Sequence, residues 1–221
     1  MSLGKRLQLI ASMIRRGSRL ADIGTDHALL PIWVIKNNIC PFVIATDISA
    51  GSATRANLAV KNAGLESRIF VRLGDGLSPL HPDEIDDIVI AGLGGETISQ
   101  IIDAARWARD DRYNFVLGPM SKTEELHKYL LTKGFSITDE QTCTHRSRIY
   151  PILTARFDPK AAAAQAKHPA AFIRGVLDTE RDYTYLKNQH DRLVAAATAL
   201  RKAGRGDDAE KLEQTAKELF L

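Results

Sequence analysis

Residues 20–31 read LADIGTDHALLP, and the rest of the chain is arranged around this stretch. Its first four residues form an apolar run, interrupted only by Asp22, that predicts a short buried strand. Gly24 follows where the strand should end, and the apolar segment 28–35 predicts the start of a helix. A strand, a glycine turn and a helix in this order are typical of a sheet that binds a nucleotide-like ligand at the carboxyl ends of parallel strands.

The glycine turn lacks the second and third glycines of a dinucleotide-binding fingerprint, because Asp26 and Ala28 stand there instead. A carboxylate at this point would repel a diphosphate. A cationic nucleoside without phosphate fits better, and S-adenosylmethionine (SAM) is such a ligand. A nicotinamide dehydrogenase on the same scaffold is the competing enzyme class, and Asp26 argues against it.

The pattern of strands and helices continues as far as residue 157. Further strands are predicted at 42–47, 68–73, 86–91, 114–117, 135–143 and 147–157. The last two should pair antiparallel at the edge of the sheet. Strands that alternate with helices indicate an α/β fold with a doubly wound, mostly parallel, seven-stranded sheet.

Capping residues set the expected limits of several helices. A first amphipathic helix begins at Leu3 and should end at Gly17. Ser49 is the expected N-cap of a helix that stops at Gly64. A capping box formed by residues 121 and 124 predicts a further helix that continues to residue 131.

The composition changes after residue 158, where we place a domain boundary. Pro169 suits the first turn of a new helix, and apolar positions in 172–200 recur in alternating steps of four and three, which is a heptad seam. Residues 204–206 break this seam, and Asp207 or Asp208 should cap a second helix. We expect one domain at residues 1–158 and a helical coiled-coil hairpin at residues 159–221.

The bulk composition is that of a globular protein of 221 residues with a net charge of +3. Cys40 and Cys143 lie far apart, which favours reduced thiols in a cytoplasmic protein, and we expect no metal site. No apolar run is long enough to predict a membrane helix. Cations gather in two segments, at residues 1–21, which contain no acid, and at residues 141–156. Each segment alone is typical of a solvated face, whereas two of them beside an acidic pocket favour a polyanionic partner.

The motifs LADIGTDHALLP, ATDIS, RLGDGL and IAGLGG, followed by an edge pair of strands and a helical hairpin, resemble the bacterial tRNA (adenine-N1)-methyltransferases that modify position 22 of tRNA. The likeness covers nearly the whole chain. It implies a Rossmann-like SAM domain with a C-terminal coiled-coil extension, SAM as cofactor and tRNA as partner. A methyltransferase for another RNA or substrate, and a non-catalytic RNA-binding module, remain alternatives, and the protein could be a monomer or a homodimer.

The resemblance assigns roles at the carboxyl edge of the sheet. Asp47, about two dozen positions after Asp22, can accept hydrogen bonds from both ribose hydroxyls, although it could also act as a helix cap. Asp75 would meet the adenine amino group or be a simple turn residue, and Asp22 should face the methionine end. The predicted cofactor-binding residues are Asp22, Gly24, His27, Asp47, Ile48, Asp75, Gly76, Gly92 and Gly94.

Asp26 is the predicted catalytic residue, because a carboxylate beside the base could stabilise the positive charge that adenine gains on methylation, or take a proton from its amino group. His27 would lie next to it, unless it is a structural histidine. Phosphate contacts are expected from basic side chains in the two cationic segments. The predicted RNA-binding residues are Lys5, Arg6, Arg15, Arg16, Arg146 and Arg148.

Overall fold

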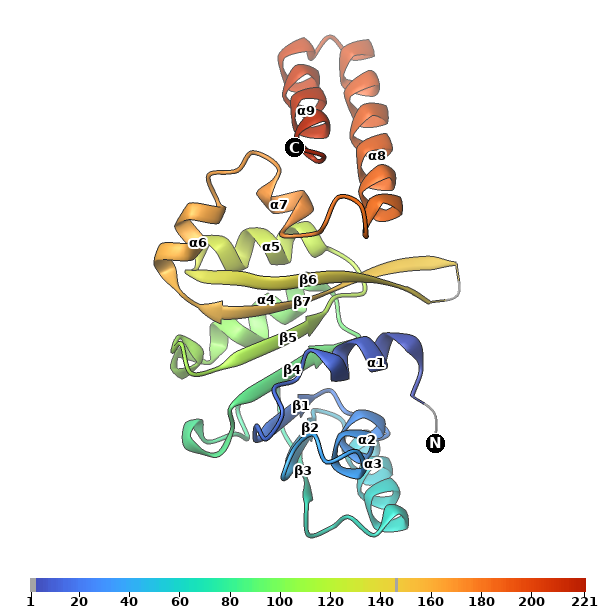
Figure 1. Ribbon diagram of the computed structural model, residues 1–221, viewed down its shortest axis with the longest axis vertical. Coiled ribbons are helices and arrows are strands. Elements are labelled where there is room, and N and C mark those ends of the chain that lie inside the picture. The colour runs from blue at the N-terminus through green and yellow to red at the C-terminus, as the bar shows by residue number, and fades with distance from the viewer. Residues whose placement is uncertain (1–2, 146) are drawn as a thin grey trace.

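The structure, a computed structural model, describes residues 3–145 and 147–221 (Figure 1). Seven strands form one sheet in the order β3-β2-β1-β4-β5-β7-β6, in which only β7 runs against the others. This confirms the predicted doubly wound, mostly parallel sheet. The strands are β1 (Leu20–Ile23), β2 (Val43–Asp47), β3 (Ile69–Leu73), β4 (Asp87–Ala91), β5 (Asn114–Gly118), β6 (Phe135–His145) and β7 (Arg148–Phe157).

The strand order reverses at β1, which pairs with β2 on one side and with β4 on the other. Ile23 at the end of β1 lies opposite Thr46 of β2 and Ile90 of β4. The connections after β1 and β4 therefore leave the sheet in different directions. This opens a crevice at the carboxyl ends of the two strands, the usual ligand position in such sheets.

Two apolar clusters cover the two faces of the sheet. One contains side chains of α1 (Lys5–Ser12), α2 (Leu29–Lys36) and α3 (Ala50–Ala63). The other contains side chains of α4 (Gly95–Ala104), α5 (Thr123–Thr132), α6 (Pro159–Gln165) and α7 (Ala171–Arg174). Helices on both faces explain why β1 and β5 are buried along their whole length.

Helix limits follow the predicted caps at α3 but not at α5. The Ser49 hydroxyl accepts a hydrogen bond from the Ser52 amide, and Gly64 ends α3 with a φ of +67°. The capping box predicted for α5 is wrong. The helix begins at Thr123, after Lys122 with a φ of +58° and without a side-chain cap, and Glu124 forms an ion pair with Arg192 instead.

The C-terminal hairpin consists of α8 (Tyr183–Lys202) and α9 (Gly206–Glu218), which project beyond the sheet in Figure 1. Leu193 of α8 and Ala216 of α9 belong to a small separate cluster with Leu219, which caps α9, and with Ala170, which precedes α7. The predicted boundary near residue 159 precedes α6 and α7, whose Ala162 and Ala171 belong to the core of the sheet domain.

Two details of the predicted hairpin are wrong. The heptad seam begins only with α8, so Val176 lies outside it and is exposed. The cap of α9 is at Arg205, and Asp207 and Asp208 lie in its first turn, where carboxylates favour the helix dipole. No helix within residues 3–145 and 147–221 is long and apolar enough to cross a membrane.

A buried clasp fixes the chain that leads into the hairpin. His127 of α5 and Glu140 of β6 are fully buried, with His127 Nε2 2.9 Å from Glu140 Oε1 and His127 Nδ1 3.2 Å from the Phe172 carbonyl oxygen. Because both ring nitrogens face acceptors, the imidazolium form satisfies both. Burial alone would lower the pKa of His127, but the neighbouring Glu140 raises it. Further along, the buried Asp182 accepts hydrogen bonds from the amide and hydroxyl of Thr142.

Candidate functional site

The loops after β1, β2, β3 and β4, which carry the predicted cofactor-binding residues, lie at the carboxyl edge of the sheet. The Gly24 amide donates to the Thr46 carbonyl at 2.8 Å, and the Gly74 amide donates to the Asp47 carbonyl at 3.0 Å. On the other side of the crevice, the Gly92 amide donates to the Gly118 carbonyl at 3.0 Å. The loops after β1, β2, β3 and β4 therefore form one continuous rim.

The turn after β1 has an unusual backbone. Gly24, Asp26 and Ala28 have φ angles of +77°, +41° and +49°. The left-handed region is unfavourable for the two residues with a Cβ, and such strain is characteristic of ligand-binding turns. A Cβ added at Gly24 would meet nothing within 4 Å, so the backbone at this point faces open space.

Asp22 lies at the base of this turn and is only 7% exposed. Burial, together with the nearby charge of Asp47, raises the pKa of Asp22 to about 6. A carboxylate held in this way gains from a cationic ligand group, which would restore the favourable interactions that the side chain loses on burial.

Asp47 ends β2 with its carboxylate fixed by two backbone amides. Its Oδ1 accepts from the Ser49 amide at 2.9 Å and its Oδ2 accepts from the Asp26 amide at 3.3 Å. Each oxygen keeps capacity for a second hydrogen bond, so local capping and ligand binding are compatible. The neighbouring Ile48 is 69% exposed and offers an apolar surface beside this carboxylate.

A cavity of about 490 Å³ lies between the loop after β3 and helix α4. The exposed Asp75 and Gly76 line it on the side of the loop, and Ile101 and Trp107 contribute apolar walls. A carboxylate at the entrance of an apolar slot suits a planar heterocycle with an exocyclic amino group.

The glycines after β4 allow a close approach between neighbouring loops. Gly92 has a φ of +90°, and Gly94 pairs with Ser121 of the loop after β5. A Cβ at Gly95 would lie 2.0 Å from the Lys122 carbonyl oxygen, so no larger residue fits there. Gly95 thus has a packing role that its sequence position alone does not reveal.

Asp26 is paired with a residue that the sequence did not identify. Arg55 of α3 donates to Asp26 Oδ1 from Nε at 3.1 Å and from Nη2 at 2.6 Å, and His27 Nε2 lies 3.4 Å from Asp26 Oδ2. The hydrogen bonds from Arg55 lower the pKa of Asp26. Asp26 is therefore held ionised, which suits charge stabilisation and disfavours proton transfer to its carboxylate.

The predicted RNA-binding residues divide between the two edges of the sheet. Arg15 makes internal contacts: its Nε donates to Asp87 Oδ1 at 2.7 Å and its Nη2 donates to two backbone carbonyls, at the amino end of β4, and its contact with phosphate stays a prediction. Arg16 follows it in the chain and is exposed. Lys5 at the start of α1 and Arg148 at the start of β7 are also exposed, whereas Arg146 lies outside the described residues.

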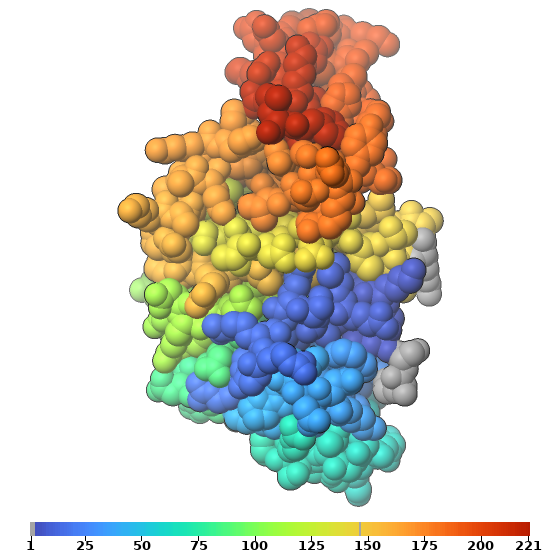
Figure 2. All heavy atoms as spheres, in the orientation of Figure 1, coloured from blue at the N-terminus to red at the C-terminus, as the bar shows by residue number. Residues whose placement is uncertain are grey.

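The N-terminal helix crosses the molecule beside the rim. Figure 2 shows this segment in dark blue between the yellow residues of the β6 region and the lighter blue residues that follow β1. Side chains of α1 pack against the sheet, and Ile10 lies within the core cluster of that face. The first turn of α1 consequently lies near the carboxyl ends of the strands, while the segment after α1 returns to their amino ends.

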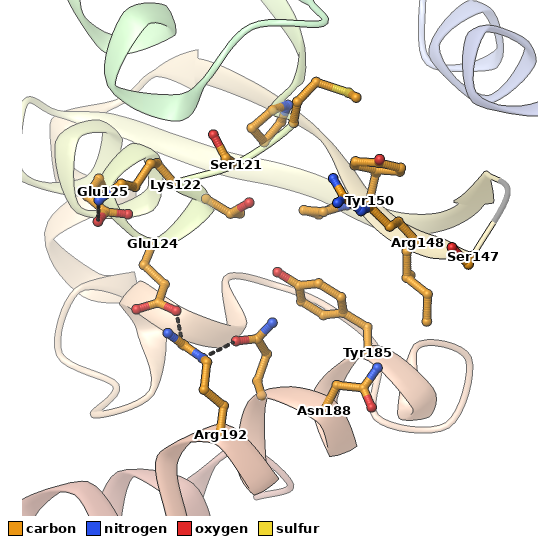
Figure 3. Close-up of a pocket in the computed structure, with 16 residues that line it drawn as sticks. Ser121, Lys122, Glu124, Glu125, Ser147, Arg148, Tyr150, Tyr185, Asn188 and Arg192 are labelled. Atoms are coloured by element: carbon orange, nitrogen blue, oxygen red, sulfur yellow. Dashed lines mark hydrogen bonds and ion pairs between the residues drawn. The ribbon is translucent and has the colours of Figure 1, made fainter. Parts of the chain in front are cut away.

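A second cavity, of about 570 Å³, lies between the loop after β5, the start of β7 and helix α8 (Figure 3). Tyr185 points from α8 into this space, with Ser121 and Tyr150 on the other walls (Figure 3). Burial raises the pKa of Tyr185 to about 12, so its hydroxyl remains a hydrogen-bond donor at neutral pH. The cavity adjoins the glycine loop, because the Met120 amide donates to the Leu93 carbonyl at 2.8 Å.

The rim offers a set of hydrogen-bond acceptors that fits SAM. Two carboxylates, Asp47 and Asp75, lie on the β2–β3 side, where hydroxyl and amino groups of a nucleoside can donate to them. Asp22 is available for an ammonium group, and the open backbone at Gly24 admits a ligand close to β1. The rim therefore fits a cationic nucleoside better than a diphosphate.

A doubly wound sheet with this strand order and an acidic rim at its switch point defines a methyltransferase domain. A family model described as "Methyltransferase domain" matches residues 3–153. The tRNA (adenine(22)-N(1))-methyltransferase of Bacillus subtilis is 30% identical over 99% of this chain and 93% of its own length. The chain belongs to the tRNA (adenine(22)-N1)-methyltransferase family.

Solved structures agree with this assignment. The crystal structure of the B. subtilis M1A22 tRNA methyltransferase superposes with a TM-score of 0.85 at 28% identity, covering 100% of this chain and 99% of that one. A putative tRNA (m1A22) methyltransferase of Streptococcus pneumoniae, in complex with S-adenosyl-L-methionine, gives a TM-score of 0.83 at 26% identity and covers both chains completely. The predicted Rossmann-like fold is confirmed.

Proposed function

We propose that this protein transfers a methyl group from SAM to N1 of an adenine in tRNA, at position 22 as in the family. The observation that carries the proposal is the match of the whole chain, hairpin included, to the Bacillus subtilis enzyme. The acidic rim supports the choice of cofactor, and the cationic residues at the same edge support a polyanionic substrate. We expect the enzyme to act in the cytoplasm, where tRNA is modified.

When bound, SAM supplies a methyl group on a positively charged sulfur, which adenine N1 can take directly because its lone pair needs no prior deprotonation. The protein's contribution is then mainly alignment. In this proposal, Asp47 accepts from the ribose hydroxyls, Asp75 accepts from the adenine amino group, and Asp22 receives the ammonium group. Gly92 and Gly94 leave room beside the methyl group, because neither has a side chain.

Asp26 acts electrostatically in this proposal. Arg55 keeps its carboxylate ionised, and an ionised carboxylate near the methylated base favours the positive charge that the base acquires. His27 lies 3.4 Å from Asp26, and its side chain is 56% exposed. Its contact with the incoming base remains a prediction.

The cavity lined by Tyr185 is the proposed route for the RNA. N1 lies on the pairing edge of adenine, so the base must leave its helix before it reaches the methyl group. The cavity adjoins the glycine loop and is lined by aromatic, amide and cationic side chains, among them Tyr150, Asn188 and Arg148. Lys5 and Arg148 are proposed to contact phosphates, as is Arg146, and Arg16 remains a predicted contact.

A methyl-transfer assay tests the proposal. The purified protein is incubated with radiolabelled SAM and a tRNA transcript, and the modified nucleotide is located by mass spectrometry after nuclease digestion. We expect label at N1 of adenine 22 and none in a matched transcript with guanine at that position. Label at another nucleotide would contradict the position, and SAM binding without any transfer would favour a non-catalytic RNA-binding module.

A further inference from the structure

Arg6 does not lie with the exposed cations of the N-terminal segment. It is in the first turn of α1, and its guanidinium reaches the carboxyl end of β4. The Arg6 Nη2 atom is 4.0 Å from the position that a Cβ on Gly92 would occupy. Arg6 thus borders the crevice between β1 and β4, and its predicted role as a phosphate ligand on the surface does not match this placement.

The guanidinium of Arg6 is incompletely hydrogen-bonded within the described residues. Its Nη1 atom is buried, and it has no hydrogen-bond partner within residues 3–145 and 147–221. None of the ion pairs found among these residues includes Arg6, although six other arginines of the sheet domain are paired. A buried cationic donor without a partner is unfavourable, and an anionic acceptor from a ligand removes this penalty.

The position of Arg6 in the crevice identifies the anion that it suits. The carboxylates for the nucleoside, Asp47 and Asp75, are on the β2–β3 side of the switch point, and the buried Asp22 is on β1. A ligand whose nucleoside lies over β2 and β3 therefore has its far end over β1 and β4. In SAM that end is the amino acid, which carries an ammonium group and a carboxylate.

We propose that Arg6 binds the α-carboxylate of SAM, while Asp22, on the neighbouring strand, receives the ammonium group. This inference rests on the proposed use of SAM at the rim. It makes α1 part of the cofactor site, since a helix packed across the sheet supplies a cation for the zwitterionic end of the ligand. Guanidinium and carboxylate form charge-assisted hydrogen bonds, which are stronger than neutral ones.

Calorimetric titration of two ligands against two proteins tests this role. The ligands are SAM and decarboxylated SAM, which keeps the sulfonium and the ammonium but has no carboxylate. We expect Arg6→Ala to weaken SAM binding about 10- to 100-fold. Decarboxylated SAM should bind the variant and the wild type within about twofold, because the carboxylate that Arg6 contacts is missing. Arg6→Lys, which keeps the charge without the planar fork, should have an intermediate affinity for SAM.

Lys61→Ala is the matched control, since it removes one exposed cation from the far end of α3 and should leave the affinity for SAM unchanged. Equal SAM affinity of Arg6→Ala and wild type would overturn the inference. The inference would also be overturned if Arg6→Ala and Arg6→Lys lost affinity for SAM and for decarboxylated SAM to the same extent. The substitutions would then have damaged the pocket in general. Failure of the wild type to bind SAM at all would instead contradict the proposed function.

Discussion

Asp22 illustrates how one residue can be placed for a ligand at the expense of stability. Its folded-state pKa of about 6 lies above the ordinary value of 3.8, so the folded protein holds the proton more tightly than the unfolded chain. The ionisation penalty is absent below about pH 4 and fully present above about pH 6. Among residues 3–145 and 147–221 this buried carboxylate forms no ion pair, and the ammonium group of SAM is the proposed partner.

Asp22→Asn should therefore stabilise the ligand-free protein and weaken its ligand binding. At pH 7.5 we expect a gain of about 2 kcal/mol in the free energy of unfolding, because the amide carries no ionisation penalty. For a chain of this size that corresponds to a rise of about 4–8 °C in Tm. The affinity for SAM should fall about 10-fold or more. Thermal melts from pH 4 to 8 and calorimetry measure the two effects, and a variant less stable than wild type at pH 7.5 would contradict the account.

Asp47→Ala is a second single-residue test, which addresses the proposed contact with the ribose. The substitution removes an acceptor for two hydroxyls, so SAM binding should weaken about 10-fold or more. Ser49→Ala is the control for the capping role, because it removes the N-cap hydroxyl of α3 and leaves Asp47 in place. An unchanged dissociation constant for SAM in Asp47→Ala would reject the contact.

At the scale of elements, Arg15 ties the end of the α1 segment to the start of β4. Asp87 is fully buried, and its carboxylate accepts hydrogen bonds from Arg15, from the Arg15 amide and from Asn114. Arg15→Ala leaves this carboxylate without its cation and should cost about 2 kcal/mol of stability, a discounted value because the Arg15 side chain is 40% exposed. Tm should fall by about 4–8 °C with little change in tRNA affinity. A weakened tRNA affinity at unchanged Tm would support the predicted phosphate contact of Arg15.

The elements themselves could be predicted well from the sequence, because apolar periodicity and caps such as Ser49 and Gly64 act over a few residues. Partnerships across the fold could not. Arg55 meets Asp26 only because α3 packs beside the turn after β1, and Arg15 meets Asp87 across 72 positions of the chain. Charge patterning identified the cations correctly but not which of them are used internally.

For the whole molecule, the rim turns could be located because each is a local departure from a simple strand–helix connection. The cavity beside α8 could not, since three segments distant in sequence form it. The capping box at residues 121–124 failed for a related reason. The Glu124 carboxylate pairs with Arg192 of the hairpin, and no local pattern contains that contact.

A protein that ends after Asp182, and so lacks the hairpin, should keep SAM binding and lose affinity for tRNA. Ala170 and Ile173 are the contacts that the small cluster of the hairpin makes with the part of the chain before Asp182, so we expect the shortened protein to fold and to bind SAM within about threefold of wild type. The cavity loses the wall that Tyr185 and Arg192 supply, and tRNA binding should weaken by at least about 10-fold. Calorimetry with SAM and filter binding with tRNA measure the two affinities. Unchanged tRNA affinity would exclude the hairpin from the RNA surface.

The clasp around His127 also has a consequence for recombination between relatives. The segment before the hairpin is anchored on α5 and β6, where Glu140 accepts from the Val176 amide and Thr142 donates to Asp182. A chimaera joined near residue 158 would take the fully buried pair of His127 and Glu140 from one parent and the segment that packs on it, with the Phe172 carbonyl and the Val176 amide, from the other. Hairpins should therefore be exchanged, in the laboratory or in descent, together with the outer edge of the sheet, so that RNA preference and this edge are inherited as one unit.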